Sequence, residues 1–151
     1  MIHPMNRTIL FIARGCFSLI FIVAGVGKLM NWQGTVDQLV LTFSEWYMHF
    51  EGSLITRDMH ELLVSSGYTI LSVATCLEIV GALFILTGFK VRIGALLLLI
   101  FMIPVTLIMH PFWFSIGSEM QRELSIFLKN LSLIGALLYF LVGPQPQRAS
   151  K

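Results

Sequence analysis

The chain has 151 residues, of which 56% are hydrophobic and 12% are charged, and its mean hydropathy is +0.84. A soluble domain carries about twice that charged fraction, so the composition excludes an ordinary soluble protein and predicts a membrane protein. The formal net charge of +2 is too small to suggest a nucleic-acid partner. Cys16 and Cys76 lie in apolar runs without a C-x-x-C pair, which argues against disulfide exchange by this chain alone.

Four apolar runs are predicted to cross the membrane as helices, because a crossing needs about 20 residues. Their predicted bounds are 8–30, 69–89, 93–112 and 124–142. Arg14 interrupts the first run, which therefore reads as a retained span and not as a cleaved signal peptide. The link at 90–92 is so short that the second and third spans must form an antiparallel hairpin. The prediction is an all-α, four-helix transmembrane bundle: a single membrane domain, 1–143, followed by a loose tail, 144–151.

The segment 31–68 is predicted to contain an amphipathic helix between the first two spans. Apolar side chains recur there at helical spacing, at Val36, Leu39, Val40, Phe43, Trp46, Tyr47 and Phe50. Such a stripe favours a helix that lies on the membrane or caps the bundle. Near the fourth span, Ser118 and Gln121 have the spacing of a capping box, which predicts that the last helix begins there, before the membrane.

The distribution of charge predicts the orientation of the spans. The segment 31–68 has five acidic residues and one arginine, a net charge of −4, and the segment 113–123 has a net charge of −1. Basic residues lie instead at both termini and in the hairpin link, at Arg7, Lys90, Arg92, Arg148 and Lys151. Since basic loops stay in the cytoplasm, both termini and the link are predicted to be cytoplasmic, and the acidic segments face outward.

Six polar residues interrupt the predicted spans and form the candidate polar pocket: Arg14, Lys28, Glu78, His110, Lys129 and Asn130. The alternating span directions put Lys28, His110 and Lys129 near the outer mouth, and Glu78 near the middle. Lys129 is predicted to face the bundle interior with Lys28 and His110, and Asn130 to hydrogen-bond a neighbouring helix.

Two interpretations of the pocket remain equally open. In one interpretation, ion pairs among these groups simply fix the helix register, a use with precedent; in the other, the groups line a pocket for a ligand or redox group. Lys28 in particular also has the position of a side chain that reaches for the membrane interface. The histidines show no metal-ligand spacing, and no nucleophile–base motif or phosphate loop is visible.

Three stretches resemble the DoxX family of small four-span bacterial membrane proteins. They are "FIVAGVGKL", "LEIVGALFILTGFKVRIGALLLLIFMIPVTLIMHPFW" and "FLKNLSLIGALL", and together they reach all four spans. The family takes its name from a subunit of a thiosulfate:quinone oxidoreductase. The resemblance therefore implies a multi-pass protein of the bacterial inner membrane, acting as a subunit linked to quinone or thiol redox chemistry.

A quinone is then the candidate cofactor, and the candidate partners are the lipid bilayer, other subunits of a redox complex, or a second copy of the chain. Two alternatives come from other classes of protein. One is a small transporter or channel for an anion, with the buried lysines and arginine as counter-charges. The other is a non-catalytic assembly scaffold.

Overall fold

The computed structural model describes residues 4–50 and 54–143. In chain order the elements are α1 (Pro4–Met30), α2 (Trp32–Phe50), α3 (Arg57–Ser65), α4 (Gly67–Thr87), α5 (Val91–Met109), the short 3₁₀ helix η1 (Phe112–Phe114) and α6 (Gly117–Val142). The described part of the chain contains no strand, which confirms the predicted all-α class. The predicted loose tail, 144–151, lies outside the described residues.

Within the described residues, four helical segments are long and apolar enough to cross a membrane: Thr8–Met30, Gly67–Thr87, Val91–Phe114 and Gly117–Val142. The predicted four-helix transmembrane bundle is therefore confirmed. The predicted capping box is wrong, because Ile116 precedes α6 in an extended conformation and no side chain caps the helix. The chain turns into α6 at Gly117, whose φ of 62° favours glycine, so Ser118 already lies inside the helix.

The hairpin of α4 and α5 forms the centre of the bundle. Its turn passes through Gly88 and Lys90, both in the left-handed region. Further along, Gly81 and Gly94 face each other so closely that a Cβ on Gly94 would lie 2.8 Å from the carbonyl oxygen of Gly81. Small residues at such a contact allow two membrane helices to pack backbone against backbone.

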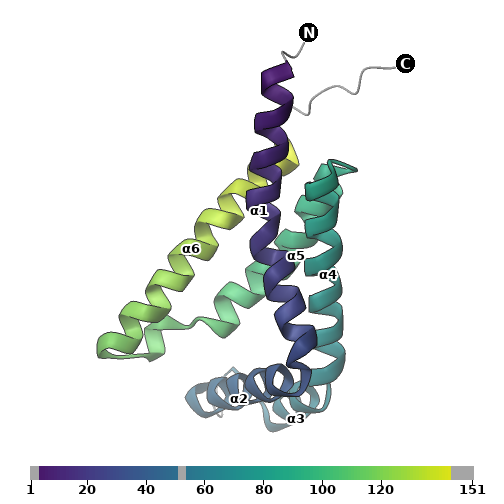
Figure 1. The fold of residues 1–151 in the computed structure, drawn as a ribbon. Coiled ribbons are helices and arrows are strands. Elements are labelled where there is room, and N and C mark those ends of the chain that lie inside the picture. The colour runs from purple at the N-terminus through teal and green to yellow at the C-terminus, as the bar shows by residue number, and fades with distance from the viewer. Residues whose placement is uncertain (1–3, 51–53, 144–151) are drawn as a thin grey trace.

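The four spans follow one another around the bundle as α1, α4, α5 and α6, each packed against the next. Helices α1 and α6 meet where the middle of α1 passes the carboxyl-terminal part of α6, and there the aromatic centroids of Phe17 and Phe140 are 5.1 Å apart. Figure 1 shows α1 and α6 diverging from there toward the other end of the bundle. We call that other end, where α2, α3 and η1 lie, the α2 end.

Helix α2 crosses the α2 end of the bundle and packs against α3, α4 and α5 (Figure 1). None of the seven apolar residues of its predicted stripe is exposed, and Val36 and Phe43 are fully buried. The predicted amphipathic helix is thus confirmed, and it caps the bundle. The indole Nε1 of Trp46 donates a hydrogen bond of 2.9 Å to the carbonyl oxygen of Ile108, one of the last carbonyls of α5. This bond satisfies a group that the helix end would otherwise leave unpaired.

Candidate functional site

A buried ion pair joins α1 to α4. Glu78 lies near the middle of α4 with 2% of its side chain exposed, and its Oε2 is 2.7 Å from Nζ of Lys28, in the last turn of α1. A carboxylate removed from water is tolerated when it is paired and hydrogen-bonded. Lys28 is therefore the partner that Glu78 requires.

A glycine makes this pairing sterically feasible. A Cβ placed on Gly25 would lie 2.7 Å from Cγ1 of Ile79 and 3.4 Å from Oε2 of Glu78. Without that carbon, α1 approaches α4 closely, and Lys28, three residues further along α1, reaches the carboxylate. The ring of Phe101, from α5, lies 5.4 Å from Nζ of Lys28, so the ammonium also has a cation–π contact. Three helices thus contribute to one polar site.

The buried face of α4 carries a further polar group beside the pair. Thr75 lies three residues before Glu78, on the same side of the helix, and is 4% exposed. Its Oγ1 has no hydrogen-bond partner, a property shared by only two other fully buried side-chain groups in the described residues, on Ser18 and Thr106. A buried hydroxyl without a partner costs about 1–3 kcal/mol, so Thr75 is available to a polar atom that enters the site.

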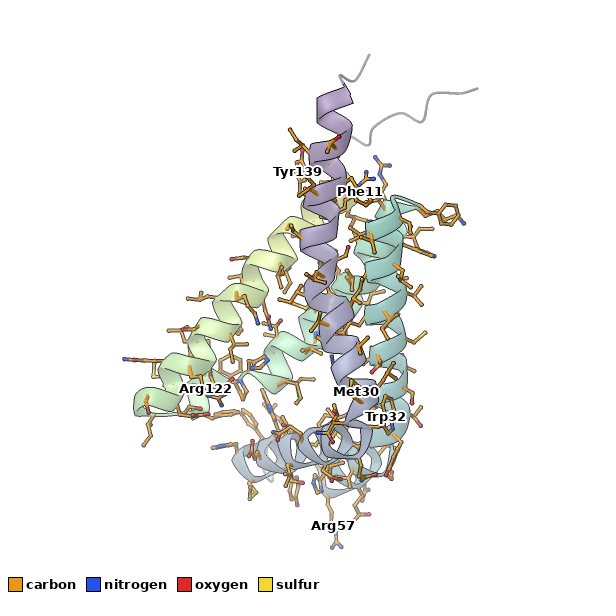
Figure 2. All side chains as sticks on the ribbon, in the orientation of Figure 1. Phe11, Met30, Trp32, Arg57, Arg122 and Tyr139 are labelled. Carbon is orange, nitrogen blue, oxygen red and sulfur yellow. The ribbon has the colours of Figure 1, made fainter. Side chains whose placement is uncertain are left out.

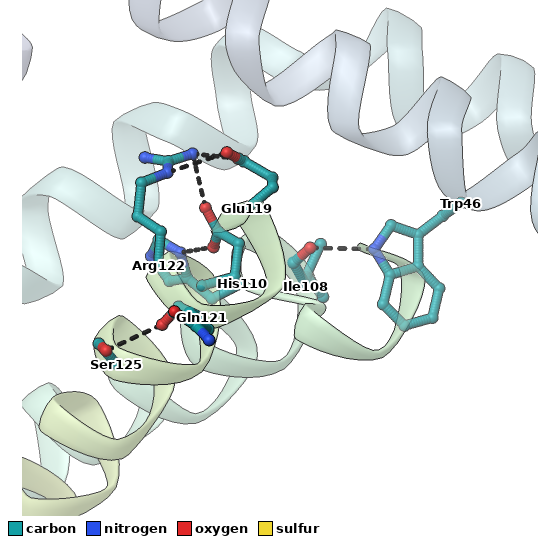
Figure 3. Close-up of polar contacts among 8 residues, drawn as sticks. Trp46, Ile108, His110, Glu119, Gln121, Arg122 and Ser125 are labelled. Atoms are coloured by element: carbon teal, nitrogen blue, oxygen red, sulfur yellow. Dashed lines mark hydrogen bonds and ion pairs between the residues drawn. The ribbon is translucent and has the colours of Figure 1, made fainter. Parts of the chain in front are cut away.

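A second polar cluster lies at the α2 end of the bundle (Figure 3). Nδ1 of His110 is 2.8 Å from Oε2 of Glu123, and the other oxygen of Glu123 is 2.8 Å from Nη2 of Arg122. Arg122 also binds Glu119. The His110–Glu123 contact ties the end of α5 to the first turns of α6, and Arg122 binds both carboxylates within α6.

Sequence reasoning missed Glu123, which it counted as a charge of the outer segment. The buried residues of α6 are Glu123, Asn130 and Leu137, which lie seven positions apart, and this spacing is the feature of the sequence that indicates the burial of Glu123. A repeat of seven keeps side chains on nearly the same face of a helix, and here that face packs against α5.

The other predicted pocket residues do not gather around Glu78. The half-buried Arg14 lies with Nη1 against Gly88, at the carboxyl end of α4, where a cation interacts favourably with the helix dipole. That end is ten residues from Glu78, or about 15 Å along the helix. His110 is bound by Glu123 instead.

The prediction that Lys129 lies in the bundle interior is wrong, because its side chain is exposed. Its neighbour Asn130 occupies the interior position and is 6% exposed. Adjacent helical residues point about 100° apart, so only one of the two can face α5. In the described residues no three His, Cys, Asp or Glu side chains are grouped to hold a metal ion.

The fold and this site define a small multi-span membrane protein whose first two spans are joined by a buried ion pair. The model of the DoxX family matches residues 9–111, a stretch that includes both Lys28 and Glu78, and the chain belongs to this family. The chain is also similar to the inner membrane protein YphA of Escherichia coli (strain K12). The two are 30% identical over 137 residues, which cover 90% of this chain and 84% of YphA. No solved structure matches the chain significantly.

Proposed function

We propose that this DoxX-family protein is a multi-pass subunit of the bacterial inner membrane that binds a quinone at the site formed by Lys28, Glu78 and Phe101. The observation that carries the proposal is the buried ion pair, with its 2.7 Å contact, in a span that faces apolar neighbours. An ionisable residue inside a membrane span is by default a candidate for function. The name of YphA, an inner membrane protein, supports the location.

The residues present suit a quinone headgroup. Such a headgroup combines an apolar ring with carbonyl oxygens that accept hydrogen bonds. Lys28, 23% exposed, has hydrogens beyond the one that it gives to Glu78, and the hydroxyl of Thr75 is without a partner. The ring of Phe101 offers an aromatic surface at the same place. A bound quinone would supply the electron chemistry, and the Glu78 carboxylate would hold or release a proton beside it.

Thiol chemistry has less support. Cys16 and Cys76 are both free and exposed on the surfaces of different spans. Neither cysteine has a second thiol beside it. In a thiol–disulfide exchange, each would therefore need a resolving thiol from another protein.

The test is the affinity of the purified protein, in lipid nanodiscs, for decylubiquinone. We expect Lys28→Met, measured on its folded fraction because the substitution also breaks the pair with Glu78, to weaken binding about tenfold or more, the usual effect of losing a hydrogen bond from a charged group. Arg57→Ala is the matched control, because it breaks the exposed pair with Glu61 far from the site. Failure of the parent protein to bind any quinone, or equal binding by the Lys28→Met variant, would contradict the proposal.

A second candidate, binding or passage of a small anion, is favoured by one observation. Lys129 is a cation inside a span, in α6, and it has no ion pair or hydrogen bond among the described residues. If an anion binds there, the melting temperature in detergent should rise with the concentration of that anion, and the Lys129→Met variant should lose the effect.

A further inference from the structure

A cluster of cations lies at the turn between α4 and α5. Nη1 of Arg14, on α1, lies against Gly88, the left-handed residue that ends α4. Lys90 follows two positions later, with its Nζ 5.4 Å from the centroid of the Phe89 ring, and Arg92 lies in the first turn of α5. We call Arg14, Lys90 and Arg92 the turn cluster. A direct contact of α1 with the turn and a short stretch of chain therefore bring the three cations together.

No acidic side chain of this chain neutralises the turn cluster. In the sequence, no acidic residue precedes Asp37 or follows Glu123, and none lies between Glu78 and Glu119. The acidic residues of α2, α3 and α6 belong to the α2 end of the bundle, and Glu78 lies about 15 Å from the carboxyl end of α4. Arg14 also has no hydrogen bond among the described residues, although a guanidinium has five N–H donors. Its donors are thus available to an anion.

The turn cluster lies at a membrane surface. One candidate span ends at Thr87 and the next begins at Val91, so the turn that joins them lies at the boundary of the bilayer. Figure 2 shows Phe11 at this end of the bundle and Arg57 at the α2 end. Arg14 belongs to the first span, and its long side chain brings the charge to the level of the turn. The three cations therefore lie at the depth of phospholipid headgroups.

Arg14 distinguishes this cluster from an ordinary basic link. Exposed basic residues are common in short links between spans, and Lys90 and Arg92 alone would indicate no more than that. Arg14 is half-buried, however, and its guanidinium is held against the turn. A guanidinium in a fixed position can give two parallel hydrogen bonds to the oxygens of a phosphate. The first turn of α5 adds N–H groups that no side chain caps.

We propose that the turn cluster binds the headgroup of a phospholipid with a net negative charge, such as phosphatidylglycerol. The phosphate lies between Arg14 and Lys90, and the exposed rings of Phe11 and Phe89 give the lipid an apolar contact beside it. Basic sites between membrane helices suit anionic headgroups in this way. A zwitterionic phospholipid fits less well, because its own ammonium group neutralises the phosphate. The site is separate from the buried ion pair, so the inference goes beyond the proposed function and does not depend on it.

The experiment measures, by native mass spectrometry, the binding of dioleoyl phosphatidylglycerol to the purified full-length protein in detergent micelles. Dioleoyl phosphatidylcholine is the zwitterionic comparison with the same acyl chains, and inorganic phosphate is the free-anion comparison. We expect phosphatidylglycerol to bind at least about tenfold more tightly than phosphatidylcholine, since it keeps the charge-assisted hydrogen bonds without a competing ammonium. Inorganic phosphate at the same concentration should not displace it, because it lacks the apolar contact.

Two variants test the residues of the turn cluster. Arg14→Gln should weaken the binding of phosphatidylglycerol about tenfold or more, because the bond from a charged donor is lost. Lys90→Asn should weaken it about fivefold, the effect of one basic residue near an anionic headgroup. Asparagine tolerates the left-handed conformation of residue 90, so Lys90→Asn alone decides if Arg14→Gln does not fold. Arg57→Gln removes the same charge from an exposed residue at the α2 end and, as the control, should bind the lipid normally.

The remaining outcomes would overturn the inference. Equal affinities for the two phospholipids would show that the charge of the headgroup is not recognised, and displacement by inorganic phosphate would identify a site for a free anion. Parental affinity in both cluster variants would mean that Arg14 only interacts with the carboxyl end of α4. An equal loss in the Arg57→Gln variant would show that net charge matters and not the turn cluster. Because no quinone is present in the experiment, none of these outcomes bears on the proposed function.

Discussion

Replacing the partners of the Lys28–Glu78 pair singly should have unequal effects on stability. Lys28→Met leaves Glu78, 2% exposed, as an uncompensated carboxylate in the bundle. Breaking a buried pair in this way typically costs about 3–5 kcal/mol. Glu78→Ala leaves Lys28, which is 23% exposed and long enough to move its ammonium toward the α2 end. We expect the unpaired charge of Lys28 to lower the free energy of unfolding of the Glu78→Ala variant by about 1–3 kcal/mol. The packing of the missing side chain is lost in addition.

Glu78→Gln should lose least of the three single variants, because the amide keeps the volume and one acceptor oxygen for Lys28. The double variant Lys28→Met, Glu78→Leu removes both charges and fills the site with apolar atoms, so its stability should return to within about 1 kcal/mol of the parent or exceed it.

The assay is equilibrium unfolding in mixed micelles, and the thermodynamic cycle consists of the parent, Lys28→Met, Glu78→Leu and the double variant. A double variant that is as unstable as the sum of its two single variants would show that the charges do not interact across the α1–α4 contact. Equal stability of all variants would mean that the pair contributes nothing to the fold.

Two further predictions concern the orientation and the α2 end. A reporter active only in the periplasm should be silent when fused after Lys151 and active when inserted near Ser53, because the acidic segments are predicted to face outward; the reverse pattern would contradict the orientation. Trp46→Phe should lower the stability by about 1 kcal/mol, since the carbonyl of Ile108 loses its donor while the aromatic contacts remain. Trp113→Phe is its control, and an equal loss there would show that ring volume matters and not the hydrogen bond.

Features that depend on local periodicity could be predicted from the sequence. The stripe of α2 is an example, because its inward face follows from 3.6 residues per turn whatever the helix packs against. The spans follow from length and hydropathy in the same way. The hairpin of α4 and α5 follows from a link of three residues, which leaves the two helices no other arrangement.

Contacts between helices could be predicted only in part. Ion pairing is one of the two interpretations that the sequence leaves open, and it does not decide whether Arg14 or a lysine pairs with Glu78. Gly25 decides between them, because it sets how closely and at which level α1 meets α4. Such a steric contact depends on the register of two helices whose paired residues, Lys28 and Glu78, lie 50 positions apart in the chain.

The pair Lys129–Asn130 shows the same limit at finer scale. A hydropathy profile shows only that both residues are polar and lie in the span. Adjacent helical residues point about 100° apart, so one side chain lies in the interior and the other outside it. The seven-residue spacing of Asn130 from Glu123 and Leu137 indicates that Asn130 faces the interior, but it can be used only when Glu123 is known to be buried.

The polar residues of the spans thus divide according to how their charge is compensated. Glu78 is paired with Lys28, which joins α4 to α1, and Glu123 is paired with His110, which joins α6 to the end of α5, and with Arg122 of its own helix. Lys129 is compensated by nothing in the described chain, although it lies as deep in its helix as any of them. Because an uncompensated charge is costly inside a membrane, Lys129 is the residue to test for an anionic ligand, whereas Lys28 and Glu78 are tested together as the proposed quinone site.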